Sequence, residues 1–177
     1  MNDKNERYLF PVRKNLRLQD FDYSSQNAYF ITICTQNKGC LFGEVEHDKM
    51  RLNQYGIIAE DCWKDLGNHY PGISNDIFMV MPNHVHGTII VSGENGREGS
   101  KPSPTKPTHL SEIVRAFKTY SSKGINTLRQ TPGIPVWQRS YYEHVIRNEN
   151  DYREIGEYIL NNPAKWANDH ENINRIK

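Results

Sequence analysis

The 177-residue chain has few cysteines, and none are spaced in a pair that binds metal. Cys34, Cys40 and Cys62 are odd in number and form no CxxC motif, which argues against a disulfide framework and favours a reducing compartment. Long apolar runs are also missing, since none approaches the ~20 residues that a membrane span requires. The N-terminus lacks the apolar core of a signal peptide. We therefore expect a cytoplasmic protein with no membrane partner.

The chain also has no large excess of one charge, because its 22 basic residues are nearly balanced by 21 acidic ones. This balance hides a basic stretch between Arg97 and Arg129, in which only Glu98 and Glu112 are acidic. Clustered positive charge with interleaved aromatic residues permits nucleic-acid binding. Taken alone, however, the pattern favours an ordinary solvated surface.

The hydrophobic pattern predicts an α+β fold. Segments rich in β-branched and aromatic residues are predicted strands: 28–38, 77–81, 84–91 and 136–146. A hairpin or edge strand is expected over 40–52. Helices are expected after Asn53, after Ser111 and after Asn148 or Asn150, the last one ending at Pro163. This order fits a ferredoxin-like antiparallel sheet with helices packed on one face.

The whole chain, 1–177, is expected to form a single domain. Its flanking segments are a basic N-terminal arm over 1–27, a Gly/Pro/Ser-rich stretch over 92–109 and a short C-terminal tail over 164–177. The composition of 92–109 is typical of a flexible loop.

Two histidines interrupt the apolar run from Phe78 to Val91. His84 and His86 are two residues apart, so on a strand their side chains project from the same face. Two neutral imidazoles in this arrangement can converge on one metal ion. The alternative is that they are ordinary surface or core histidines. A nucleotide-hydrolase motif with a third alternating histidine is excluded, because Thr88 occupies that position.

The last predicted helix can complete such a site. Tyr158 and Asn162 are four residues apart and therefore share a helical face. The phenol of Tyr158 could lie beside an ion that the amide oxygen of Asn162 reaches, although Tyr158 could also simply pack beside Ile155. Gly156 costs roughly 1 kcal/mol in a helix interior, which indicates that another group approaches closely there.

Three stretches together carry a family resemblance: "MPNHVHGTIIV", "VWQRSYYEHVIRN" and "EYILNNPAKW". They resemble the REP-associated tyrosine transposases, which belong to the HUH single-tyrosine nucleases. The resemblance extends from about Arg13 to Trp166. It implies that Tyr158 attacks a DNA phosphodiester and leaves a 5′-phosphotyrosine link and a free 3′-OH. It also implies that His84, His86 and Asn162 hold a divalent ion, Mg²⁺ or Mn²⁺.

The resemblance implies single-stranded DNA as the partner, at hairpin-forming repeats. Basic, aromatic and histidine side chains are expected to contact it: Arg13, Arg17, Arg115, Lys118, Trp137, Arg139, Tyr141 and His144. Core packing is an equal alternative for Trp137 and Tyr141, which alternate on one predicted strand face. One tyrosine cleaves one strand at a time, so a full excision needs either a homodimer or successive reactions. The short tail after Trp166 departs from some relatives and leaves the mode of hairpin recognition open.

Two other functions remain open at this point. One is a non-catalytic protein that binds single-stranded DNA hairpins, although such a protein would not need the histidines, Tyr158 and Asn162 together. The other is a metal-dependent phosphodiesterase that uses water, with Tyr158 in a structural role. A covalent protein–DNA adduct distinguishes the transposase from both.

Overall fold

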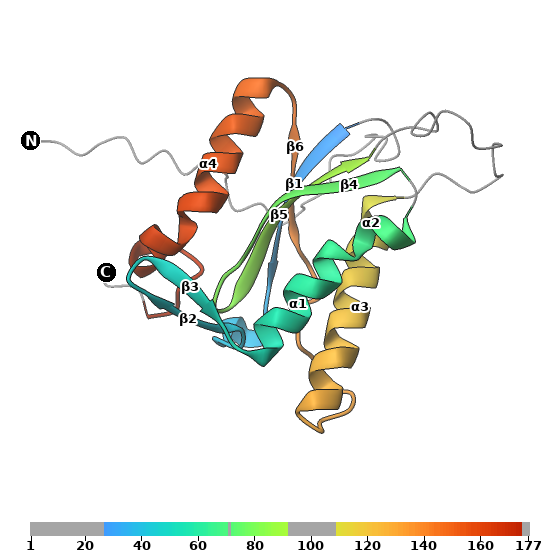
Figure 1. Cartoon of the computed structure of the whole chain (residues 1–177), viewed down its shortest axis with the longest axis vertical. Helices are drawn as coiled ribbons and strands as arrows, with labels where there is room; N and C mark the ends of the chain where they lie inside the picture. The colour runs from blue at the N-terminus through green and yellow to red at the C-terminus, as the bar shows by residue number, and fades with distance from the viewer. Residues whose placement is uncertain (1–26, 71, 92–108, 175–177) are drawn as a thin grey trace, which may run out of the picture.

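A computed structural model describes residues 27–70, 72–91 and 109–174. The predicted arm up to residue 26, the loop from 92 to 108 and the predicted DNA contacts Arg13 and Arg17 lie outside the described residues. A four-stranded antiparallel sheet forms the centre, in the order β4-β5-β1-β6 (Figure 1). Its strands are β1 (Asn27–Cys34), β4 (Ile73–Val80), β5 (His84–Val91) and β6 (Tyr142–Ile146).

Two helices that connect these strands cover one face of the sheet. They are α1 (Gln54–Lys64), which is followed by the short α2 (Leu66–His69), and α3 (Leu110–Leu128). Tyr29, Ile31 and Ile33 of β1 alternate toward this face and pack with Trp63 of α1 and Phe117 of α3 in one apolar cluster. The ferredoxin-like α+β fold, with helices packed on an antiparallel sheet, is therefore confirmed.

The last helix, α4 (Glu149–Lys165), lies against the opposite face of the sheet (Figure 1). Phe30 of β1 packs there with Ile155 and Ile159. A Cβ atom on Gly156 would lie 2.7 Å from Cδ1 of Ile77, so the group that approaches this glycine is a side chain of β4. The fold thus has helices on both faces of the sheet, whereas the sequence predicted helices on one face; the second face is covered by α4.

The prediction that this helix ends at Pro163 is wrong. A proline removes the hydrogen bond of its own N–H and crowds the carbonyl four residues earlier, but the residues after it keep their N–H donors, so near its end a helix can continue past a proline. Here α4 continues to Lys165 and passes into a 3₁₀ turn, η2 (Trp166–Asn168). This turn brings the following residues back toward the sheet.

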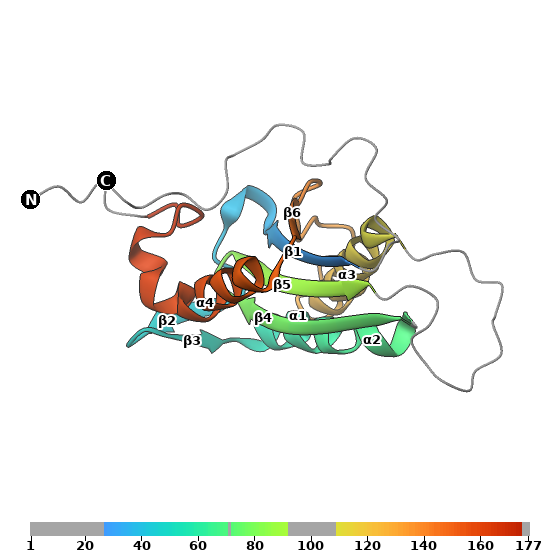
Figure 2. The ribbon, with the colours of Figure 1, turned by 90° about the horizontal axis from the view of Figure 1, so that it is seen from above.

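A two-stranded hairpin, β2 (Gly43–Glu46) and β3 (Lys49–Leu52), was expected over 40–52 and is present. It follows the short 3₁₀ turn η1 (Gln36–Lys38) and extends beside the C-terminal end of α4 (Figure 2). Asn53 then caps α1, since its side-chain oxygen accepts hydrogen bonds from the N–H groups of Tyr55 and Gly56. None of the helices in the described ranges is long and apolar enough to cross a membrane.

The strand predicted over 136–146 is only partly formed. β6 begins at Tyr142, and before it Trp137 makes an isolated bridge to Thr35. The intervening carbonyl groups bond to a side chain: Lys118 Nζ donates to the carbonyls of Gln138 (2.9 Å), Arg139 (3.1 Å) and Ser140 (3.0 Å). The chain here bonds to β1 through the N–H of Gln138, which donates to the carbonyl of Cys34 (2.9 Å), while the carbonyls that follow are held by Lys118 of α3.

Replacing Lys118 with methionine should therefore destabilise the fold. An unsatisfied buried acceptor costs about 1–3 kcal/mol. Because the bonds to Arg139 and Ser140 are exposed to solvent, we expect a loss of about 1–2 kcal/mol in the free energy of unfolding, measured by urea denaturation. Lys123→Met, at an exposed position of the same helix, should change it by less than about 0.5 kcal/mol. Equal effects of the two variants would contradict the structural role of Lys118.

Candidate metal centre and nucleophile

The two histidines of β5 lie on the face of the sheet that α4 covers. Strand pairing places His86 opposite Thr32 and His84 opposite Cys34, both on β1. Val85 and Ile89 of β5 point to the other face and belong to the apolar cluster under α1 and α3. The predicted shared orientation of His84 and His86 is thus present, because both sit on the same side of the strand's pleat.

Both imidazoles are buried and face each other. Their exposed fractions are 0% for His84 and 1% for His86, and their Nε2 atoms lie 2.9 Å apart. Burial lowers the pKa of His84 to about 3. Burial, together with the neighbouring His84, also lowers the pKa of His86 well below its usual value. Both rings are therefore neutral at neutral pH, the form in which an imidazole binds a metal ion.

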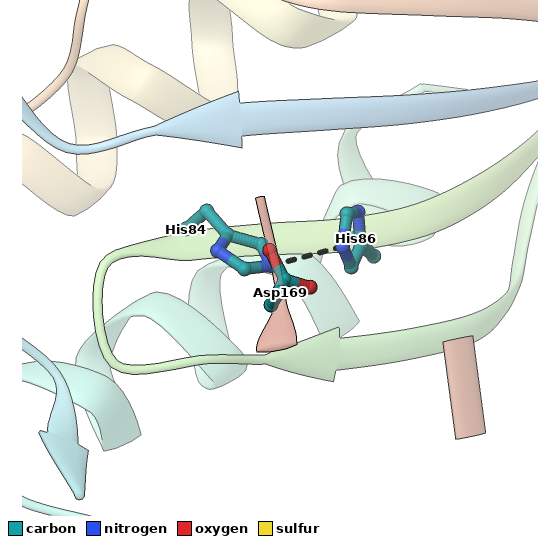
Figure 3. A group of neighbouring side chains, drawn as sticks. All are labelled: His84, His86 and Asp169. Atoms are coloured by element: carbon teal, nitrogen blue, oxygen red, sulfur yellow. Dashed lines mark hydrogen bonds between the residues drawn. The ribbon is translucent and has the colours of Figure 1, made fainter. Parts of the chain in front are cut away.

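A carboxylate that the sequence analysis did not anticipate lies at the same point. Asp169, which follows the η2 turn, points toward both histidines, with one potential ligand atom from each of the three residues within 4.8 Å of the others (Figure 3). Asp169 is 8% exposed. Its Oδ1 accepts a 2.6 Å hydrogen bond from the N–H of Glu171, which fixes the carboxylate in place. Two imidazole nitrogens and a carboxylate are a ligand set that suits a divalent ion.

Asn162, the expected third ligand, lies beside this carboxylate. Its Nδ2 atom donates a 2.8 Å hydrogen bond to Oδ2 of Asp169. Its Oδ1 atom is buried and has no hydrogen-bond partner among the described residues. A buried acceptor without a donor costs free energy that a bound cation would recover. Histidine lone pairs, a carboxylate and this amide oxygen make the centre rich in acceptors, so its residues fit a divalent cation.

The phenol of Tyr158 reaches the same centre from α4. Its hydroxyl lies 3.5 Å from Nε2 of His86, and its ring packs edge-on against Phe30 at 6.0 Å between centroids. The pKa of Tyr158 is raised well above its usual value, mainly by burial and secondly by the negative charges of Asp169 and Glu171. The hydroxyl therefore stays protonated in this environment and becomes a good nucleophile only where positive charge favours the phenolate.

A polar network anchors the segment that carries Asp169. The carboxylate of Glu171 accepts hydrogen bonds from Lys38 (2.8 Å), His170 (2.7 Å) and the thiol of Cys34 (3.2 Å). Burial alone would raise the pKa of Glu171, but the hydrogen bonds from His170 and Lys38 outweigh it and hold this pKa well below its usual range. The backbone carbonyl of Glu171 also accepts a 2.7 Å hydrogen bond from Asn83. The chain after α4 is thus tied to the end of the sheet that bears the histidines.

Several predicted DNA contacts are placed differently. Trp137 is 6% exposed, belongs to the core cluster and donates a hydrogen bond from Nε1 to Ser121 (2.9 Å), so the packing alternative holds. Tyr141 packs against the same cluster, and Lys118 Nζ lies 5.4 Å from the centre of its ring. The ammonium group of Lys118 donates its hydrogen bonds to the three backbone carbonyls described above. Burial lowers the pKa of Lys118 to about 8.

The remaining predicted contacts lie on three different elements. Arg115 is exposed on α3, which covers the opposite face of the sheet. Arg139 is exposed in the segment before β6. His144 of β6 is bonded through Nε2 to Asp151 in the first turn of α4, at 3.1 Å. His144 therefore helps to dock the start of this helix.

Comparisons with known proteins place this geometry in context. No family model matches the chain. An uncharacterised protein of Haemophilus influenzae is 37% identical over 166 residues, which cover 89% of this chain and 91% of that protein. A second Haemophilus influenzae protein, named "Putative REP-associated tyrosine transposase", is 22% identical over 144 residues, 81% of this chain and 74% of that protein.

A solved structure shares the fold. It is a REP-associated tyrosine transposase bound to a REP hairpin, with a TM-score of 0.56 and 20% sequence identity, covering 85% of this chain and 74% of that one. The chain thus belongs to one family with the 37% identical Haemophilus influenzae protein, and its recognition as a relative of the REP-associated tyrosine transposases is confirmed.

Proposed function

We propose that this protein is a metal-dependent endonuclease and strand transferase that cleaves single-stranded DNA through a 5′-phosphotyrosine intermediate. The observation that carries the proposal is the convergence of His84, His86, Asp169 and the Tyr158 hydroxyl on one buried face of the sheet. The resemblance to tyrosine transposases supports a DNA-processing enzyme.

His84, His86 and Asp169 would hold the divalent ion, and the free oxygen of Asn162 is placed to assist. A carboxylate and an amide alongside two imidazoles suit Mg²⁺ or Mn²⁺. When bound, such an ion polarises a phosphodiester and stabilises the charge that develops on its oxygens. Asn162 would also orient Asp169, because its amide donates to that carboxylate.

Tyr158 would supply the nucleophilic oxygen. Its packing against Phe30 holds the ring at the edge of the centre, so the hydroxyl needs no large movement to reach a phosphate placed there. Attack on phosphorus would form a bond from the phenolic oxygen to the 5′ phosphate and break the bond from phosphorus to the 3′ oxygen; the phenol loses its proton and the 3′ oxygen gains one, so a free 3′-OH results. The reverse attack by a 3′-OH rejoins DNA without ATP, because the phosphotyrosine conserves the bond energy.

Hairpin-forming repeats are the substrate we propose. The solved relative is described as bound to a REP hairpin, which supports a similar partner here. A protein that binds hairpins without cleaving them would have no use for the group of His84, His86 and Asp169 or for the phenol of Tyr158 beside it. A water-using phosphodiesterase would not need Tyr158, so trapping of a covalent adduct separates it from our proposal.

We expect cleavage of single-stranded DNA beside a hairpin and little cleavage of linear duplex, because a half-buried phenol on α4 cannot reach phosphates in a regular duplex. Binding should also weaken with salt: four neutralised phosphates would lower affinity about 50-fold between 50 and 200 mM salt. Labelled oligonucleotides in both forms measure cleavage, and fluorescence anisotropy measures affinity. Equal cleavage of duplex and single strands would refute this substrate preference.

A further inference from the structure

Each of the two facing histidines makes a hydrogen bond through its other ring nitrogen, and the two partners differ in kind. Nδ1 of His84 lies 2.8 Å from Oδ1 of Asn83, whereas Nδ1 of His86 lies 2.8 Å from Oγ1 of Thr32. An amide oxygen can only accept a hydrogen bond, but a hydroxyl can donate or accept one. This difference decides which nitrogen of each ring carries the proton.

The orientation of Asn83 is determined by two carbonyl groups. Its Nδ2 atom donates to the carbonyl oxygens of Glu171 (2.7 Å) and Lys38 (3.1 Å), and the side chain is fully buried. Its Oδ1 atom must therefore face His84 and accept a proton from Nδ1. In neutral His84 this leaves the lone pair on Nε2, the atom that faces the centre.

The proton positions of His86 follow from those of His84. The two Nε2 atoms are 2.9 Å apart, and two lone pairs at that distance would repel each other. Before a cation binds, Nε2 of His86 therefore carries a proton and donates it to His84, while Nδ1 of His86 accepts from the hydroxyl of Thr32. A cation at Nε2 requires this proton to move to Nδ1. The hydroxyl of Thr32 can then turn and accept a hydrogen bond from this Nδ1–H group. The proton stays on the ring, so the imidazole of His86 is neutral in both tautomers.

We propose that Asn83 holds His84 permanently in the metal-binding tautomer, whereas Thr32 allows His86 to change into that tautomer when a cation binds. Asn83 acts from the turn between β4 and β5, and Thr32 acts from β1 directly opposite His86. Both are positioning residues, since each acts through a histidine. The inference rests on the proposed function, because it requires both histidines to be ligands.

The tautomers can be observed directly by long-range ¹H–¹⁵N NMR on the ¹⁵N-labelled full chain. Zn²⁺ serves as a diamagnetic probe. His84 should carry its proton on Nδ1 both with and without Zn²⁺. His86 should change from the Nε2–H form to the Nδ1–H form on addition of Zn²⁺. An Nε2–H form of His84, or an Nδ1–H form of His86 before Zn²⁺ is added, would overturn the inference.

Two variants of Thr32 test the same point by affinity. Thr32→Val keeps the shape of the side chain but removes the hydroxyl, so Mn²⁺ binding measured by electron paramagnetic resonance should weaken about 10- to 100-fold. Thr32→Ser keeps the hydroxyl and should bind within about threefold of the unmodified protein. Circular dichroism establishes that both variants fold. Unchanged affinity in Thr32→Val overturns this inference alone, whereas absence of Mn²⁺ binding by the unmodified protein overturns the proposed function itself.

Discussion

Replacing Tyr158 with phenylalanine should abolish DNA cleavage and the covalent protein–DNA adduct. Phenylalanine has no atom that can attack phosphorus, so the rate should fall by more than about 10³-fold. The ring that packs against Phe30 is retained, so the fold and the affinity for single-stranded DNA should change little. Denaturing gels of reactions with labelled hairpin oligonucleotides measure the adduct.

Two other tyrosines on this side of the molecule provide matched controls. Tyr142 packs edge-on against Phe30 as Tyr158 does, and the hydroxyl of Tyr152 donates a hydrogen bond to Asp76. The pKa of Tyr152 is raised to about 12, mainly by burial and secondly by the hydrogen bond to Asp76. Tyr142→Phe and Tyr152→Phe should both retain the adduct. An adduct that persists in Tyr158→Phe but is lost in one of these variants would move the nucleophile to that residue.

Removing a metal ligand should have an effect of similar size. His84→Ala deletes one of the converging lone pairs, and several kcal/mol of lost transition-state stabilisation correspond to a rate loss on the order of 10³-fold. Asp169→Asn should act in the same direction, because a neutral amide replaces the one charged oxygen donor of the set. Cleavage assays and Mn²⁺ titrations of each variant give the measurement.

His69→Ala serves as the control for this series. His69 is an exposed histidine of α2, so its replacement should have no effect on cleavage.

Excess chelator should inactivate the unmodified protein, and Mg²⁺ or Mn²⁺ should restore cleavage. Full activity in chelator would rule out the metal assignment, even if the tyrosine experiment succeeded. Normal activity of Asp169→Asn with loss in His84→Ala would instead limit the ligands to the histidines and Asn162.

The parts of the site that depend on local periodicity could be predicted from the sequence. The pleat alone sets His84 and His86 on one face, and the helical repeat alone sets Tyr158 and Asn162 on one side of α4. Asp169 could not be predicted in this way, because its position depends on an irregular turn after the helix. A usable signal is the polar run "NDHEN" over residues 168–172, just after Trp166 and Ala167, in which Asp169 and Glu171 are buried without any apolar periodicity.

The error at the strand predicted over 136–146 has a different cause. Val136 and Trp137 are apolar because they fill the core, and the same composition is typical of a strand. Whether the following carbonyl groups pair with a strand or with Lys118 is decided by α3, a helix distant in sequence. Composition therefore indicates an apolar segment, but it does not decide between core packing and DNA contact for Trp137, and the hydrogen-bond partners depend on tertiary contacts.

The alternation of β5 also has a consequence for folding. A slip of one residue in its pairing with β1 would move Val85 and Gly87 into the polar centre and drive His84 and His86 into the apolar cluster beneath α1 and α3. Burying a polar ring without its hydrogen-bond partners costs at least about 1–3 kcal/mol, so two of them penalise the slipped pairing strongly. Trp63 reinforces this selection, because it lies where only Gly87 leaves room for its ring. The histidines therefore make pairing of β5 with β1 in any register shifted by one residue less stable. This effect is independent of any chemistry that they perform once folding is complete.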